Sequence, residues 1–392
     1  MSGSHPLPDR VVVVGAGLAG GRTCTALRAA GFAGDVILVG AEDHAPYDRP
    51  PLSKAVLTQG ADPDLGLDLV GQGVKLQLGV AATGIDLAAK VLTTETGPIS
   101  YDALVLATGL QPIRLPGNGP QVTLRTIEDA RHLRGCLVPG ARVAVIGAGW
   151  IGAEVATAAL GLGCEVTCLD SASAPLAGPL GERVGSMFLP WWDGVDLRLG
   201  TRIREVGAHG PVLADGELIA ADVVLTAVGA RAQTGWLASA GLEVTDAGVA
   251  VGADHRTSDP HVYAVGDIAS RWSDRLGRRV HNGHWDEAAS GPAAVAASIL
   301  GLPPKPEDVP YFWSGQFGRK LQYVGQHDEA DVVVVRQHED PDKWAVAWLD
   351  AMGRLTAHLS VGYPRSLVQA RAAIADGRLV DPDRCRDLGQ PL

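Results

Sequence analysis

Four consecutive valines, Val11–Val14, precede glycines at positions 15, 17 and 20. A run of β-branched residues predicts a strand that is buried on both faces of a parallel sheet. Gly15 permits a tight turn, Gly17 lets the backbone approach a pyrophosphate, and Gly20 lets the following helix pack closely on the strand. A helix that begins near Leu18 would offer unpaired backbone N–H groups to a phosphate. The segment therefore predicts a dinucleotide-binding turn.

This glycine spacing is a weak signal by itself in a chain with 50 glycines, so its recurrence matters. The stretch 143–152 repeats the strand and the spacing, and the stretch 164–170 repeats the acid-ended strand that residues 35–42 form first. In each copy a carboxylate, Glu42 or Asp170, follows where a βαβ unit places the acceptor for the hydroxyls of an adenosine ribose. The sequence thus predicts an α/β fold with two Rossmann-like nucleotide-binding domains.

Size and charge limit the remaining possibilities. With 392 residues the chain is long enough for two or three domains. Its formal net charge of −11 argues against a general nucleic-acid binder, which needs a basic surface. No apolar run is long enough to span a bilayer, and Met1–Arg10 has no apolar stretch of the kind found in export signals. We therefore expect a cytoplasmic protein that binds neither nucleic acid nor membrane.

The cysteines do not indicate a metal or disulfide site. None of the five belongs to a C-x-x-C pair, so neither a zinc ribbon nor a thioredoxin-type centre is predicted. Cys164 and Cys168 fall in the strand before Asp170, where buried thiols that pack as small hydrophobes are expected. A redox pair at these two positions is the alternative.

A proline-rich segment, residues 45–54, follows the first nucleotide unit. Pro51 can occupy the first turn of a helix, which would place Ser53 and Lys54 in that turn. A lysine is electrostatically unfavourable at a helix N-terminus unless an anion compensates it. The alternative is a surface loop with a solvated lysine.

The rest of the chain predicts a closing strand for each nucleotide unit, a long helix and a third, α+β domain. Residues 102–109 and 221–229 form the closing strands, and residues 262–267 form a strand that delivers Asp267 to a turn. A helix rich in Ala and Val is expected from His284 to about Leu300. After several prolines the texture changes to short alternating strands, including 343–350 and 354–361, and a helix over 365–375.

Seven motifs in this order resemble a known family. They are GAGLAG at 15–20, YDRPPLSK at 47–54, ATG at 107–109, GAGWIGAE at 147–154, VYAVGD at 262–267, HW at 284–285 and YFWSGQ at 311–316. The chain resembles the FAD- and NADH-dependent ferredoxin reductases of bacterial oxygenase systems, the putidaredoxin reductase-like group, whose fold is that of glutathione reductase. The resemblance covers nearly the whole length, and YDRPPLSK is its most specific motif.

The resemblance implies domain boundaries and cofactor sites. It implies an FAD-binding domain over 1–113 and 247–308, an NAD-binding domain over 114–246 and a C-terminal α+β interface domain over 309–392. The residues implied at FAD are Gly15, Gly17, Leu18, Ala19, Gly20, Glu42, Arg49, Lys54, Ala107, Thr108, Gly109, Gly266, Asp267, His284 and Trp285. The residues expected at NAD(H) are Gly147, Gly149, Trp150, Ile151, Gly152, Asp170 and Gly229.

Three residues are expected to serve the reaction itself. By similarity, Glu154 would pair with Lys54 near the flavin ring, and Trp313 would lie near the nicotinamide side. An ordinary helix acid and a domain-packing aromatic are the alternatives for Glu154 and Trp313. Relatives usually read WSDQ where this chain has Gly315 in place of the acid, which puts in doubt how that segment is held. No metal site is predicted.

The function implied by the resemblance is electron transfer from NADH, through FAD, to a [2Fe–2S] ferredoxin that supplies an oxygenase such as a cytochrome P450. A rubredoxin, dehydroascorbate-radical or disulfide reductase, or a redox sensor with little turnover, remains an alternative. Because ferredoxins of this kind are usually acidic and this chain is too, docking requires a local basic patch. Candidates for that patch are Arg271, Arg275, Arg278 and Arg279, and separately Arg319 and Lys320.

Overall fold

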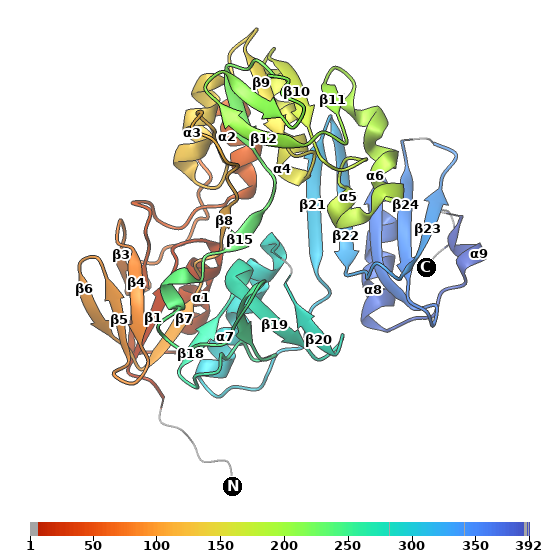
Figure 1. The fold of residues 1–392 in the computed structure, drawn as a ribbon. Helices are drawn as coiled ribbons and strands as arrows, with labels where there is room; N and C mark the ends of the chain where they lie inside the picture. Colours follow the sequence, from red (N-terminus) through yellow and green to blue (C-terminus); the bar gives the residue numbers. More distant parts are fainter. Residues whose placement is uncertain (1–6, 282, 341, 388–389, 391) are drawn as a thin grey trace. The chain divides into compact units, whose positions relative to one another are not determined.

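The computed structural model describes residues 7–281, 283–340, 342–387, 390 and 392 (Figure 1). The chain forms two compact units. The first unit comprises Met1–Arg49, Pro63–Gln111 and Ala230–Glu307. The second comprises Pro50–Asp62, Pro112–Gly229 and Asp308–Leu392. The domain boundaries expected from the sequence stay a prediction.

The first unit is built on a parallel sheet of five strands in the order β18-β7-β1-β2-β3. Its strands are β1 (Arg10–Val14), β2 (Asp35–Val39), β3 (Val74–Gln77), β7 (Ala103–Leu106) and β18 (Val262–Ala264). Helices α1 (Leu18–Ala29) and α7 (Trp285–Ile299) pack on each other and on one face, in a core that includes Val11, Val13 and Leu27. The alternate valines Val12 and Val14 enter a second core on the other face. Burial on both faces explains the continuous valine run.

Smaller elements complete the first unit. Two sheets flank the parallel one, in the orders β4-β5-β6 and β16-β17-β19-β20. Their strands are β4 (Ala82–Asp86), β5 (Val91–Thr94), β6 (Gly97–Ser100), β16 (Val244–Thr245), β17 (Gly248–Val251), β19 (Ala269–Ser273) and β20 (Arg278–Val280). Strands β8 (Leu110–Pro112) and β15 (Ala230–Ala232) pair with each other. Two 3-10 turns are η3 (Gly235–Leu237) and η4 (Gly266–Ile268).

The second unit contains the repeat of the nucleotide-binding motif. Its parallel sheet has the order β11-β10-β9-β14, with β9 (Arg142–Ile146), β10 (Glu165–Leu169), β11 (Asp196–Arg198) and β14 (Val223–Thr226). Helix α4 (Trp150–Gly161) follows β9 and packs on β9 and β10. The other elements are η1 (Pro50–Ser53), α2 (Ala55–Gln59), α3 (Ile127–Cys136), α5 (Ala177–Leu180), α6 (Glu182–Gly185), η2 (Ser186–Trp192), β12 (Ile203–Gly207) and β13 (Gly210–Leu213). Strands β12 and β13 form a sheet of two strands.

The C-terminal part of the second unit is an antiparallel sheet in the order β21-β22-β25-β24-β23, drawn in blue in Figure 1. Its strands are β21 (Tyr311–Gln316), β22 (Arg319–Gly325), β23 (Val332–Gln337), β24 (Trp344–Leu349) and β25 (Leu355–Val361). Helix α8 (Pro364–Ala375) covers one face, and α9 (Pro382–Cys385) follows it. The predicted hairpin, terminal helix and α+β character are confirmed.

Aromatic side chains of η2 pack against this C-terminal sheet. Phe188 and Trp191 of η2 contact the Trp344 ring at centroid distances of 5.3 and 6.3 Å. Trp192 contacts Phe317 at 5.0 Å, and the backbone N–H of Phe317 donates to Thr157 of α4 at 2.9 Å. Within the second unit, the C-terminal sheet is therefore anchored on η2 and α4.

The cysteines are as expected from the sequence, whereas the proline-rich segment differs at Lys54. All five cysteines are free, and burial raises the pKa of the Cys164 and Cys168 thiols, as expected for packed hydrophobes rather than a redox pair. Lys54 does not lie in a first helical turn: it is the residue between η1 and α2. Pro50 and Pro51 start a 3-10 turn that ends at Ser53, so the chain restarts its helix after Lys54.

None of the helices in the described part of the chain is both long and apolar enough to cross a bilayer. Among the same residues, no group of three or more His, Cys, Asp or Glu side chains is arranged to hold a metal ion.

The C-terminal sheet predicts an acid-sensitive stability. His358 is fully buried, with Nε2 3.1 Å from Ser366 Oγ, and burial together with the Arg336 charge lowers its pKa to about 3. Below pH about 6.5 the unfolded chain therefore binds a proton that the folded chain refuses until near pH 3. This group alone lowers the free energy of unfolding by up to about 1.4 kcal/mol per pH unit across that window.

We expect His358→Gln to flatten the pH dependence of the unfolding free energy between pH 6 and pH 4. The measurement is chemical denaturation at several pH values. His209→Gln is the matched control, because His209 is exposed and should leave the slope unchanged. Equal slopes for the unmodified protein and the His358 variant would contradict the assignment.

Candidate cofactor and electron-transfer sites

The first glycine turn leaves no room for side chains at two positions. Gly15 has φ +111°, and a Cβ there would lie 2.3 Å from the Ala107 carbonyl oxygen. A Cβ on Gly20 would lie 1.9 Å from the Gly15 carbonyl oxygen. Gly17 differs, because a Cβ on it would meet only Arg49 Nε at 4.0 Å. Since Gly17 directly precedes α1, open space lies at the start of that helix, with a guanidinium beside it.

Glu42 holds this guanidinium in place. Its carboxylate accepts a hydrogen bond from Arg49 Nη2 at 2.9 Å and from Tyr47 Oη at 2.5 Å. The Arg49 guanidinium also lies over the Tyr47 ring, 5.5 Å from its centroid. A cation close to the N-terminus of α1 suits a site for a diphosphate. The carboxylate expected at a ribose thus has two protein partners.

Four more of the predicted FAD residues lie at or near the 266–268 turn in the first unit. Gly266 has φ +70°, and a Cβ on it would lie 2.9 Å from Ala19 Cβ and 3.7 Å from Ala288 Cβ. The turn η4 therefore lies between the first turns of α1 and α7. Trp285 Nε1 donates to Asp48 Oδ1 at 2.7 Å, which ties the start of α7 to the segment that carries Arg49.

His284, the residue before α7, is neutral at physiological pH. Burial lowers its pKa to about 4, although the nearby Asp267 charge opposes that shift. The structure therefore brings Gly266, Asp267, His284 and Trp285 to the same part of the first unit. His281 contacts the backbone of Asp267, with Nε2 2.8 Å from the Asp267 carbonyl oxygen.

The second glycine turn repeats the geometry of the first. A Cβ on Gly147 would lie 2.4 Å from the Ala227 carbonyl oxygen, and one on Gly152 would lie 1.9 Å from the Gly147 carbonyl oxygen. Gly149 precedes α4, and a Cβ there would meet none of the described atoms within 4 Å. Trp150 and Ile151 begin the helix, with Ile151 exposed. Gly229 has φ +109° and lies between β14 and β15.

Asp170 has a role in this turn that the sequence did not predict. Its Oδ2 accepts the Ala148 N–H at 2.6 Å, and its Oδ1 accepts the Ala172 N–H at 2.8 Å. The carboxylate therefore fixes the glycine turn as well as ending the strand. Oxygen lone pairs remain on an ionised carboxylate for a ribose, since it can accept about four hydrogen bonds.

Lys54 and Glu154 form an ion pair in the second unit, in which the carboxylate is buried and the lysine is partly exposed. Lys54 Nζ lies 2.6 Å from Glu154 Oε2, and the Glu154 side chain is only 5% exposed. Two serines complete the partners of the carboxylate: Ser314 Oγ donates to Oε1 at 2.5 Å, and Ser53 Oγ donates to Oε2. One carboxylate thus joins η1, α4 and β21. The anion that compensates Lys54 is Glu154.

Ser53 and Ser314 are the polar residues that sequence reasoning missed. Ser53 stands inside the YDRPPLSK motif, so its neighbour Lys54 could have drawn attention to it. Ser314 carries a weaker signal, since only the position next to Trp313 in a strand-like segment distinguishes it. Neither signal reveals that both hydroxyls meet Glu154.

The strand that contains Trp313 is intact despite the departure at Gly315. Trp313 is half-buried and stacks on Tyr311 at 5.6 Å between ring centroids. Gly315 pairs in register with Lys320, and a Cβ on Gly315 would meet none of the described atoms within 4 Å. Ladder hydrogen bonds hold this segment, so an acid at position 315 is not needed for it to form a strand.

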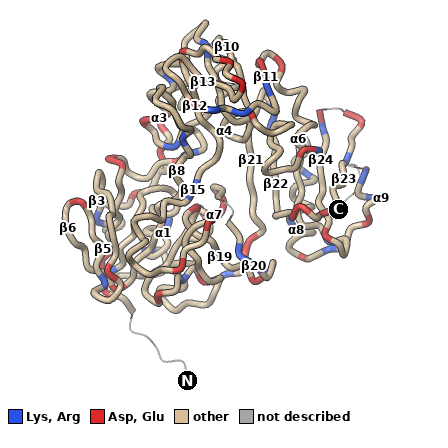
Figure 2. The backbone as a smooth tube through the Cα atoms, in the orientation of Figure 1, with Lys and Arg blue, Asp and Glu red and all other residues tan. Residues whose placement is uncertain are grey.

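The first of the two basic clusters is less accessible than expected. Arg271 is buried and paired with Glu287 and Glu307, so it is not a docking residue. Arg279 donates to the Val251 and Ser270 carbonyls at 2.8 and 3.0 Å. Docking requires charges that face solvent, but Arg271 lies on β19, where Trp272 is the exposed residue. Figure 2 shows both charge signs along this segment.

Two family models match the chain. One, described as pyridine nucleotide-disulphide oxidoreductase, matches residues 9–290, and one described as reductase C-terminal matches residues 311–392. The chain belongs to the pyridine nucleotide-disulphide oxidoreductases. The expected resemblance and fold class are confirmed.

Individual relatives of this pyridine nucleotide-disulphide oxidoreductase match it along nearly their full length. It is 36% identical to the ferredoxin–NAD(+) reductase component of the anthranilate 1,2-dioxygenase system of Burkholderia cepacia, over 97% of each chain. The crystal structure of Fdr9 is 49% identical, with a TM-score of 0.95 over 98% of this chain and 99% of that one. The reductase in a covalent putidaredoxin reductase–putidaredoxin complex is 32% identical, with a TM-score of 0.92 over 97% and 96%.

The family implies FAD and NAD(H), and the residues present fit both. In the first unit, the open space at Gly17 and the cation beside it suit a diphosphate. Thr108 Oγ1 is buried beside this turn and has no hydrogen-bond partner among the described residues, as expected of an atom that a ligand satisfies. In the second unit, the open Gly149 position at the start of α4 offers a second diphosphate site.

The Lys54–Glu154 ion pair of this oxidoreductase predicts a kinetic effect. Glu154→Gln removes the charge that balances Lys54; it keeps one acceptor oxygen and replaces the other with an NH2 donor. A charge-assisted hydrogen bond contributes about 1.5–3 kcal/mol, so we expect reduction of the bound flavin by NADH to slow by at least about tenfold. FAD should stay bound. Rapid mixing with NADH under anaerobic conditions measures the rate.

Glu128→Gln is the matched control for Glu154→Gln. Glu128 also forms an ion pair, with Arg131 at 2.7 Å, but its side chain is 64% exposed. Exposed pairs contribute little, so this variant should reduce its flavin at the unmodified rate. An unchanged rate for Glu154→Gln would reject a functional role for the pair.

Asp170 predicts a preference between coenzymes. Ser171, Ala172 and Ser173 follow it, with no arginine to receive a 2′-phosphate, so we expect NADH to be preferred over NADPH by at least about tenfold in kcat/KM. Asp170→Ala should raise KM for both coenzymes, because the Ala148 N–H loses its acceptor. Adding Ser171→Arg to that variant should narrow the preference. Equal kcat/KM values for both coenzymes in the unmodified protein would contradict this prediction.

Proposed function

We propose that this protein is an NADH-dependent, FAD-containing reductase that passes electrons to a [2Fe–2S] ferredoxin serving an oxygenase such as a cytochrome P450. The observation that carries the proposal is the similarity, over 97% of each chain, to a ferredoxin–NAD(+) reductase component of a dioxygenase system. Two glycine turns with open helix starts, one in each unit, support separate sites for the two nucleotides. Such a reductase would draw on the NADH of the cytoplasm, where we expect it to work.

The residues of the chain bind and orient the nucleotides. Arg49 and the first turn of α1 would hold the FAD diphosphate, and the first turn of α4 would hold that of NADH, because both helix starts are open. Bound FAD supplies the acceptance of a hydride and the return of electrons one at a time. Hydride transfer depends on orientation and exclusion of water, so no protein acid or base is required.

We assign supporting roles to the Lys54–Glu154 pair and to Trp313. The Lys54 ammonium is held by a buried carboxylate that two serines fix, so it supplies a positive charge of defined position, which favours the arrival of negative charge at a nearby cofactor. Trp313 is proposed at the nicotinamide side of the flavin. Both assignments rest on the motifs YDRPPLSK, GAGWIGAE and YFWSGQ.

The alternatives differ in their electron acceptor. A rubredoxin or dehydroascorbate-radical reductase would use the same two nucleotide sites. A disulfide reductase is disfavoured because the five cysteines are free and burial raises the pKa of Cys24, Cys164, Cys168 and Cys385. A redox sensor would bind both nucleotides with little turnover.

A turnover assay with a panel of acceptors tests the proposal. The purified protein should release FAD on denaturation and should reduce cytochrome c with NADH far faster when a [2Fe–2S] ferredoxin is added. Ferricyanide serves as the acceptor that needs no docking. Release of FMN, or a faster rate with rubredoxin or a disulfide than with every ferredoxin, would overturn it. NADH binding without turnover of any acceptor would favour the sensor.

Arg278 and Lys320 offer the clearest tests of a basic docking patch. Reversal of Arg279 would also break its two hydrogen bonds to backbone carbonyls, so it is left unchanged. We expect Arg278→Glu and Lys320→Glu, made separately, each to lower the ferredoxin-dependent rate several-fold, because charge reversal opposes an acidic partner. Ferricyanide reduction should not change.

The same two variants should respond less to salt than the unmodified protein, whose ferredoxin-dependent rate should fall as ionic strength rises. Arg131→Glu is the control, since it reverses an exposed charge on α3 outside either cluster. A ferredoxin-dependent rate that does not change with salt or with either reversal would exclude both clusters as docking sites. Equal loss of the ferricyanide activity would point to misfolding instead.

A further inference from the structure

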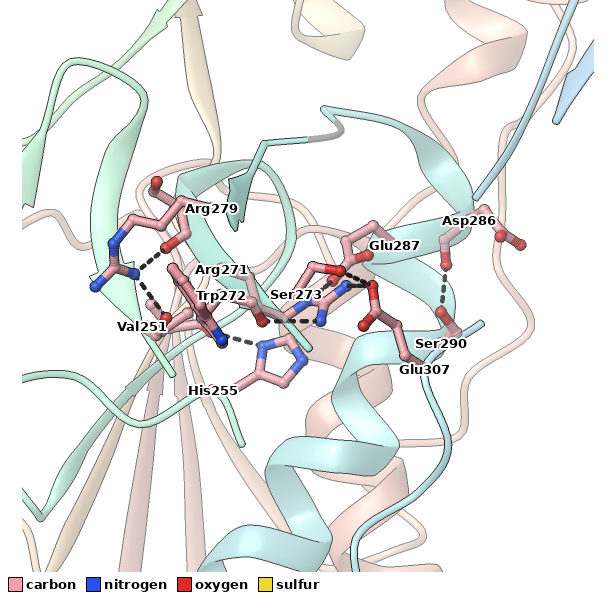
Figure 3. A network of polar contacts seen from close by, with 12 residues as sticks. Val251, His255, Arg271, Trp272, Ser273, Arg279, Asp286, Glu287, Ser290 and Glu307 are labelled. Atoms are coloured by element: carbon pink, nitrogen blue, oxygen red, sulfur yellow. Dashed lines mark hydrogen bonds and ion pairs between the residues drawn. The ribbon is translucent and has the colours of Figure 1, made fainter. Parts of the chain in front are cut away.

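Arg271 is a buried arginine with a partner for each guanidinium nitrogen (Figure 3). Its side chain, on β19, is 9% exposed. Nε lies 3.3 Å from Glu287 Oε1, and Nη2 lies 3.2 Å from Glu307 Oε1. Nη1 donates to the Trp272 carbonyl oxygen at 3.3 Å. Such full use of a desolvated guanidinium indicates a fixed position rather than a mobile surface charge.

Glu287 places this arginine against the first turn of α7. The helix begins at Trp285, so Glu287 lies within its first turn. Strand β19 begins at Ala269, directly after η4. Arg271 therefore clamps the strand that leaves the 266–268 turn onto the helix start that packs against that turn. The Trp285–Asp48 hydrogen bond holds the same helix start from another segment.

Glu307 anchors the opposite side of the guanidinium. Its carboxylate accepts a hydrogen bond from Ser273 Oγ at 2.6 Å and from the Arg275 N–H at 3.4 Å. Although burial opposes it, these bonds and the Arg271 charge hold the pKa of Glu307 below its usual range. Glu307 is therefore ionised at neutral pH.

The charges around Arg271 come from several elements. A Cβ on Gly291 of α7 would lie 3.3 Å from His255 Cε1 and 3.5 Å from Glu287 Oε1, so the imidazole is close to the Glu287 carboxylate. Burial lowers the pKa of His255, which leaves it neutral. The Arg275 guanidinium interacts electrostatically with Glu307. Arg271 thus forms an ion pair with Glu287 in a setting that several elements share.

We propose that Arg271 is a positioning residue for FAD, which holds the first turn of α7 against the Asp267-bearing turn and neutralises Glu287 there. This inference rests on the proposed function, because it needs FAD in the first unit. The first backbone N–H groups of a helix have no partner within the helix and carry partial positive charge. A carboxylate in that turn opposes their attraction for a negatively charged ligand, and the Arg271 charge offsets that of Glu287.

Substitutions at Arg271 and Glu287 should shift the flavin reduction potential in opposite directions. Arg271→Met removes the cation that joins the Glu287 and Glu307 carboxylates, so the first turn of α7 should shift and FAD should bind at least about tenfold more weakly. The Glu287 charge, no longer balanced by Arg271, should also make the flavin reduction potential more negative. Glu287→Gln removes a negative charge, so the potential should become less negative.

Two further variants separate positioning from general stability. Arg271→Lys keeps the charge but cannot span both carboxylates, so it should restore the potential more fully than the FAD affinity. Arg271→Met combined with Glu287→Gln should have a potential closer to the unmodified value than Arg271→Met alone. Arg142→Met is the control, because its ion pair with Asp222 at 2.7 Å is half-exposed.

The readouts are FAD affinity and reduction potential, which do not depend on turnover. Apoprotein is titrated with FAD by quenching of flavin fluorescence, and the potential is measured by equilibration with a redox dye. Unchanged affinity and potential in the folded Arg271 variants would overturn the inference. If Arg271→Met does not fold, Glu287→Gln decides, since an unchanged potential there has the same meaning. An unmodified protein without FAD would instead contradict the proposed function.

Discussion

A backbone-to-backbone approach that excludes every side chain is the constraint on which both nucleotide units depend. At Gly20 and at Gly152 the following helix comes so near the preceding turn that a Cβ would lie 1.9 Å from a carbonyl oxygen. This approach aims the first turns of α1 and α4 at the carboxyl ends of the central strands. The space beside Gly17 and Gly149 exists because the helices are fixed in this way. The backbone geometry alone thus leaves room at the start of each helix.

The parts of the structure that depend on neighbouring residues could be predicted from the sequence. The valine run, the two glycine turns and the hairpin before α8 each carry a local pattern, and each forms as expected. Propensity and periodicity act over a few residues, so one sequence is enough to recognise them. The exception, Lys54, shows the limit of the local argument: prolines predict a turn but not where the helix restarts.

Contacts between distant residues could not be predicted in the same way. Ser314 meets Glu154 across 160 positions, and Ser53 meets it across 101. Arg271 reaches Glu307 across 36 positions, and nothing in the arginine cluster marks it as the buried member. Each of these pairs results from packing, and a serine or arginine has the same local pattern on the surface as in a core. The motifs identified Lys54 and Glu154, whereas the hydroxyls that fix them required the structure.

The aromatic contacts of η2 have a consequence for how this kind of protein can be divided. Phe188, Trp191 and Trp192 are buried, and they contact rings on β24 and at the end of β21. A fragment that stopped before residue 308 would expose three large aromatic side chains and leave the Glu154 carboxylate without Ser314. The C-terminal sheet is therefore not a detachable module. It covers the aromatic side chains of η2 in the second unit. Recombination between relatives should therefore exchange η2 and the C-terminal sheet together.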